Sequence, residues 1–183
     1  TPYFKGVQIG LINIADSCNV IPIGLLSFVK NGYHSFEISA DELFQANLAF
    51  RSGVEKLHTI FIAGIKPNNI GSPLWTVGAG IGTSQSISAK TKLDIDLVSQ
   101  QVIKKSNWSN NYLYKFYLGM DRTLNSHMSL AFGVTYNFLV TDLKEDAHHE
   151  YYDDIAPYTF SSQSYDSFNL KSWAGFKVGL RFK

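Results

Sequence analysis

Two segments of strictly alternating residues, joined by a short polar turn, dominate the second half of the chain. In the first segment, bulky apolar positions share one face: Tyr112, Tyr114, Phe116, Leu118 and Met120. In the second they are Met128, Leu130, Phe132, Val134, Tyr136, Phe138 and Val140. Successive side chains of a β-strand point to opposite faces, so this pattern predicts a β-hairpin. One face of it is bulky and apolar, and the other is small, polar or charged.

Similar patterns along the chain predict about ten strands. Their ranges are Tyr3–Ala15, Asn19–Val29, Tyr33–Ala40, Phe44–Arg51, Leu57–Ile65, Trp75–Ile81, Thr91–Leu97, Tyr112–Met120, Met128–Val140 and Ala174–Phe182. In the first two the alternation is only partial, and the likeness of GVQIGLINIA to VIPIGLLSFV indicates a short stacked repeat. Residues 39–51 are ambiguous, because Ser39-Ala40-Asp41-Glu42 matches both a helix capping box and a tight turn before a strand.

Strand length and face composition together favour a membrane barrel. Strands of about nine to eleven residues suit a tilted crossing of hydrocarbon, and bulky faces suit lipid while small polar faces suit a narrow interior. We therefore predict an all-β fold: a closed antiparallel up-and-down transmembrane β-barrel of about ten strands, with eight as the alternative, in a single domain over residues 1–183. The predicted charge network of the barrel interior comprises Arg51, Lys92, Asp94, Asp96, Lys115, Asp121, Lys177 and Arg181.

Connection lengths alternate along the chain and predict an orientation. Counted from the C-terminus, the segments Thr141–Asn169, Gln100–Asn111 and Lys66–Pro73 are long, and Asp121–Ser126, Thr83–Lys90 and Ser52–Lys56 are short. Outer-membrane barrels have longer extracellular loops and short periplasmic turns, so the termini are expected to be periplasmic. A net charge of +1 provides no general attraction for nucleic acid.

Two stretches resemble known bacterial proteins. The C-terminal Gly-Leu-Arg-Phe-Lys resembles the closing strand of bacterial outer-membrane barrels. The first third, beginning GVQIGLINIADSCNVIPIGLL, is similar to the segment that ends the surface repeats of Bacteroidetes-type envelope proteins. These resemblances imply a bacterial outer-membrane location, with lipid and other envelope proteins as neighbours, and they imply no activity. The chain shows no secretory signal, which predicts a mature or trimmed product.

The sequence assigns no catalytic, cofactor-binding or metal site, and no GxSxG motif occurs in it. The long polar loop over residues 141–169 is the predicted interaction surface, with His148, His149, Tyr151, Tyr152, Tyr158 and Phe160 as its candidate residues. We expect a non-enzymatic envelope subunit that presents this loop. Two alternatives are a membrane-embedded lipid hydrolase or acyltransferase, with His58 or Asp94 and Asp96 near the rim, and a soluble lipocalin-like barrel with its crowded face inside around an apolar ligand.

Overall fold

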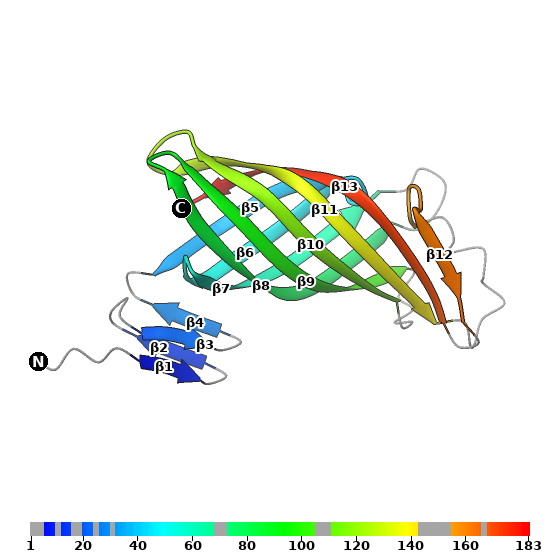
Figure 1. Cartoon of the computed structure of the whole chain (residues 1–183), viewed down its shortest axis with the longest axis horizontal. Coiled ribbons are helices and arrows are strands. Elements are labelled where there is room, and N and C mark those ends of the chain that lie inside the picture. Colours follow the sequence, from blue (N-terminus) through cyan, green and yellow to red (C-terminus); the bar gives the residue numbers. More distant parts are fainter. Residues whose placement is uncertain are drawn as a thin grey trace, which may run out of the picture.

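The computed structural model describes residues 6–9, 12–15, 20–23, 26–29, 32–67, 73–104, 111–142, 155–165 and 168–183, and these residues form strands and turns without a helix. Among them no helix is long and apolar enough to span a membrane. A closed antiparallel barrel accounts for most of the described chain (Figure 1).

Eight strands form the barrel wall, each antiparallel to its neighbours. They are β5 (Tyr33–Asp41), β6 (Ala46–Val54), β7 (Leu57–Lys66), β8 (Leu74–Ser88), β9 (Thr91–Lys104), β10 (Asn111–Thr123), β11 (Met128–Asp142) and β13 (Phe168–Phe182). The barrel closes because β13 pairs with β11 on one side and with β5 on the other. An additional short strand, β12 (Ser161–Ser164), pairs with residues 169–172, near the start of β13.

The register of the wall determines how steeply the strands tilt. A row of paired residues that starts at Phe36 on β5 passes through each successive strand and reaches Ser172 on β13. Phe36 itself pairs with Phe182, ten residues beyond Ser172. A stagger of this size over eight strands corresponds to a tilt of about 40°, given about 3.3 Å per residue and about 4.8 Å between strands. The lumen is therefore narrow enough to be filled by side chains.

The predicted strand number of ten is wrong, and the alternative of eight is correct. The first two predicted strands are not part of the wall. Instead they contribute β1 (Gly6–Ile9), β2 (Ile12–Ala15), β3 (Val20–Ile23) and β4 (Leu26–Val29), each four residues long. The physical reason is visible in the sequence: apolar residues alternate through Val7, Ile9 and Leu11, then change face at Ile12.

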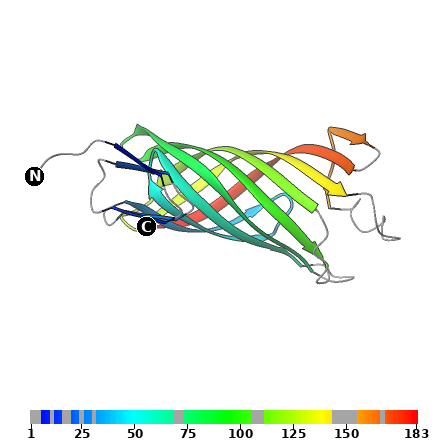
Figure 2. The same cartoon turned by 90° about the horizontal axis from the view of Figure 1, so that it is seen from below.

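The four short strands form a parallel stack with a repeat of 14 residues. β1 pairs with β3 and β2 with β4, and both pairs have the same offset, from Gly6 to Val20 and from Ile12 to Leu26. This is the register in which the two similar segments of the sequence align. The stack lies next to one end of the barrel, with β3 and β4 beside β6 and β7 (Figures 1 and 2).

The two ends of the barrel differ. We call the end at the left in Figure 1 the lower end and the opposite end the upper end. The lower end holds the C-terminus and the short turns at 55–56, 89–90 and 124–127. The upper end has the turn at 42–45 and the strand termini Lys66, Leu74, Lys104, Asn111, Asp142 and Phe168. The ambiguous residues 39–51 contain no helix. They form the end of β5, a tight turn and the start of β6.

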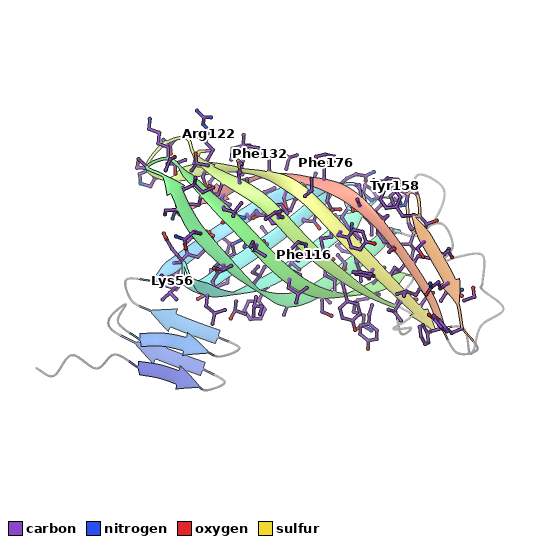
Figure 3. All side chains as sticks on the ribbon, viewed as in Figure 1. Lys56, Phe116, Arg122, Phe132, Tyr158 and Phe176 are labelled. Carbon is purple, nitrogen blue, oxygen red and sulfur yellow. The ribbon has the colours of Figure 1, made fainter. Side chains whose placement is uncertain are left out.

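Side-chain burial alternates along the wall, with polar residues inside. On β10 the alternate residues Asn111, Leu113, Lys115, Tyr117, Gly119 and Asp121 are buried, and the residues between them are exposed. Large apolar side chains are exposed on seven strands: Phe36, Ile38, Leu48, Trp75, Val77, Ile81, Ile95, Leu97, Tyr114, Phe116, Leu118, Phe132, Val134, Tyr136, Phe176, Val178 and Leu180. On β7 the outward Phe61 and Ile65 are partly buried. Figure 3 shows Phe116, Phe132 and Phe176 on this outer surface.

Candidate functional site: a charged lumen below an apolar plug

The lower half of the lumen contains a connected cluster of buried charges, which we call the charge cluster. Arg51 lies at its centre and donates from Nη2 to Asp96 Oδ2 at 2.6 Å and to Glu37 Oε2 at 3.1 Å. Its Nη1 also donates to Asp96 Oδ1 at 2.9 Å. The contact with Asp96 is thus bidentate, the geometry in which a guanidinium binds a carboxylate best.

Arg181, two residues from the C-terminus, is the second centre of the charge cluster. Its Nε donates to Glu37 Oε2 at 2.6 Å, and its Nη1 contacts both Asp94 and Asp121, the latter at 3.1 Å. All four side chains are inaccessible to solvent. One guanidinium therefore joins β5, β9, β10 and β13 across the lumen.

Two further side chains complete the charge cluster. Lys177 Nζ lies 3.0 Å from Glu37 Oε1 and 3.7 Å from the centre of the Tyr117 ring, a cation–π contact. The His58 ring lies beside that of Tyr33, and its Nε2 is 3.1 Å from Arg51 Nη1. In the described part of the chain the cluster holds four carboxylates (Glu37, Asp94, Asp96 and Asp121) and three cations (Arg51, Lys177 and Arg181), with Lys183 at the lower rim as a fourth.

The residues predicted for the interior network separate into three groups. Arg51, Asp94, Asp96, Asp121, Lys177 and Arg181 belong to the charge cluster. Lys115 is buried higher in the lumen, where it pairs with Asp41. Lys92 lies at the lower rim and pairs with the exposed Glu55. Glu37, which contacts three cations, was missed, although it alternates with the apolar Phe36 and Ile38 in the sequence.

The β5–β6 turn folds into the lumen above the charge cluster. Asp41 Oδ1 stabilises the turn by accepting hydrogen bonds from the backbone N–H groups of Leu43, at 2.9 Å, and Phe44, at 2.7 Å. Asp41 Oδ2 accepts a further bond, at 3.1 Å, from Nδ2 of Asn47. The carboxylate thus satisfies donors that a four-residue turn would otherwise leave unpaired.

Glu42 links this turn to the opposite wall. Its carboxylate accepts hydrogen bonds from Thr135 Oγ1 at 3.2 Å, Asn137 Nδ2 at 2.7 Å and Trp173 Nε1 at 3.0 Å. The carboxylate lies directly against the backbone of Gly175, where a Cβ atom would overlap it. Because glycine has no Cβ, it admits this close approach.

An apolar plug closes the lumen above Glu42. It consists of Leu43 and Phe44 from the turn, Ile155 from the segment before β12, and inward residues of five wall strands: Leu74, Val102, Leu113, Leu139 and Trp173. None of these side chains is more than 6% exposed. The described lumen is therefore occupied along its length, first by paired charges and then by packed apolar groups.

The predicted interaction residues fall in two regions. His148, His149, Tyr151 and Tyr152 lie outside the described residues. Tyr158 and Phe160 are exposed beside β12, and their rings make an edge-to-face contact. Within the described ranges no group of three or more His, Cys, Asp or Glu side chains has a geometry that could hold a metal ion.

Comparisons of the chain with protein-family models, curated proteins and solved structures found no match.

Proposed function

We propose that this protein is an integral β-barrel of the bacterial outer membrane with a structural or accessory role in the cell envelope. The observation that carries this proposal is the inverted distribution of polarity: buried arginines and aspartates face inward, and exposed Phe, Leu, Val and Tyr side chains face outward around the wall. A contiguous exposed apolar surface of this extent marks an interface with lipid or another protein.

The dimensions of the outer surface support a bilayer. On β10 the outward apolar residues run from Tyr112 to Met120. Eight steps of about 3.3 Å, tilted by about 40°, correspond to about 20 Å along the barrel axis, close to the apolar band of about 25 Å in outer-membrane barrels. Exposed charges such as Arg122 and Lys56 lie at the lower end, as Figure 3 shows. The short turns and the first and last residues of the wall, Tyr33 and Phe182, are at this same end, which we assign to the periplasm.

The filled lumen favours a non-enzymatic, non-conducting role. Solute passage would require breaking the ion pairs of Arg51 and Arg181 and displacing the apolar plug. His58, Asp94 and Asp96, the candidates for a hydrolase or acyltransferase, are 2% exposed or less and serve as partners of arginines. They do not face a rim where lipid could reach them.

The outer surface also weighs against a lipocalin-like barrel. Such a protein would bury its crowded apolar faces around a ligand and expose charges to water. The outward depression at the end of β5, with a volume of about 320 Å³, is instead lined in large part by the apolar side chains of Ala40, Phe132, Phe176 and Val178.

Membrane fractionation of cells that produce the protein, combined with gel mobility before and after heating in detergent, tests the proposal. We expect the protein in the outer-membrane fraction, where urea and high salt do not extract it, and a heat-dependent change of mobility. Recovery as a monomer in detergent-free buffer would contradict the proposal.

A further inference from the structure

The barrel wall is incomplete near its upper end. β5 and β6 have nine residues each, whereas β8, β9, β11 and β13 have 14 or 15. β5 pairs with β13 only from Lys177 to Phe182. Above Lys177, the edge of β13 that faces away from β11 therefore has no barrel strand in the described part of the wall. An unpaired edge cannot be left facing hydrocarbon, because lipid provides no hydrogen-bond partners.

Residues 155–164, which we call the strap, cover this edge. Its strand β12 pairs with residues 169–172 of β13, and the backbone N–H of Phe160 donates to Ser172 O at 2.8 Å. Further down, the Tyr158 hydroxyl donates to the carbonyl oxygen of Ala174. The strap thus supplies partners to the edge just above the point where β5 ends.

The strap also has two chemically distinct sides. Toward the lumen, Ile155 is 3% exposed and packs with Leu43, Phe44 and Trp173 in the apolar plug, and Ala156 packs against the same cluster. On the other side, Tyr158 and Phe160 are 49% and 69% exposed. Phe160 is nearly as exposed as Phe176, an outward residue of β13 at 73%. Over residues 155–160 this division resembles that of the wall strands, with the packed side inward and the bulky aromatic side outward, while all four residues of β12 are exposed.

We propose that the strap is a partial wall element that faces the outer leaflet of the membrane, with Tyr158 and Phe160 in contact with lipid and not with a soluble partner. The proposal rests on the membrane location proposed above. The hydrogen bonds to β13, the buried Ile155 and the exposed aromatic pair support it. Tyr side chains favour the boundary between headgroups and hydrocarbon, where the ring is apolar and the hydroxyl has a polar partner.

Site-directed spin labelling in phosphatidylcholine vesicles tests the strap. The chain has one cysteine, Cys18, so single labels can be placed in a Cys18→Ser background. Labels at Phe160→Cys, at Phe176→Cys on the outer wall and at His127→Cys in an exposed lower turn are compared by collision with oxygen, which concentrates in lipid, and with a water-soluble nickel chelate. We expect the oxygen-to-nickel accessibility ratio at position 160 to match that at 176 and to exceed that at 127 several-fold.

The outcomes separate the two proposals. A label at 160 with the water-like ratio of 127, while 176 keeps a lipid-like ratio, would overturn the strap assignment and leave the membrane barrel intact. Water-like ratios at both 160 and 176 would overturn both proposals. In the same background, Ile155→Asp is expected to release the strap and shift the ratio at 160 toward that at 127, and an unchanged ratio would contradict the anchoring role of Ile155.

Discussion

Replacing Arg181 with methionine is expected to destabilise the folded barrel by about 3–5 kcal/mol, the usual cost of removing one partner from a buried ion pair. The side chain is fully buried and contacts Glu37, Asp94 and Asp121. Methionine retains much of the apolar stem, so the main loss is the charge. Among the described residues, Asp94 then loses its ion-pair partner, and Asp121 keeps only Lys183, 3.9 Å away at the rim.

Lys92→Met is the matched control, since its ion pair with Glu55 is at the rim. The two side chains are 19% and 47% exposed, and exposed pairs contribute about 0–1 kcal/mol. Guanidinium unfolding in phosphatidylcholine vesicles, followed by tryptophan fluorescence, measures both variants, with equal slopes required for comparison. Losses below about 1 kcal/mol for both would refute the inference that the charge cluster stabilises the barrel. If Arg181→Met does not fold, Arg181→Lys is expected to fold with reduced stability.

Three further substitutions test other parts of the structure. Glu42→Ala removes the acceptor of the Trp173 indole N–H and of two other donors, so unfolding titrations should show a loss of about 1–3 kcal/mol, and Glu42→Gln should lose less. Val134→Arg places a charge in the centre of the outward apolar surface and should cost about 2–4 kcal/mol in vesicles, whereas a soluble barrel would tolerate it and show unchanged stability. Gly53 has a φ of 142° before the β6–β7 turn, so Gly53→Ala should lower stability by about 1–3 kcal/mol, and an unchanged melting temperature would contradict that strain.

Period-two alternation predicted most of the wall because burial in a barrel follows the strand period directly. On β10, every residue assigned to an inner or outer face from Tyr112 to Asp121 lies on that face. The method failed for residues 3–29, where alternation changes phase and both faces are apolar. Such segments can be a wall strand or a short stacked strand, and only pairing with other segments decides between them.

The candidate site was less accessible to sequence reasoning. Alternation indicated which charges are inward, but it gave neither their partners nor their height in the lumen, so Lys92 and Lys115 were grouped with residues they do not contact. Glu42 was missed entirely as a site residue. Its partners lie 93 to 131 residues away in the chain, and a local pattern of turn residues carries no information about such distant contacts.

The pairing of β13 with β5 has a consequence for the order in which the chain folds. Every other wall contact joins wall strands that are consecutive along the chain, whereas this one joins Phe36 to Phe182 across almost the whole domain. Closing so long a loop costs more chain entropy than forming any of the hairpins, so we expect this contact to form last. Folding would thus end with the six residues of β13 from Lys177 to Phe182, and a chain truncated before Lys177 should form an unclosed sheet that is open to proteolysis.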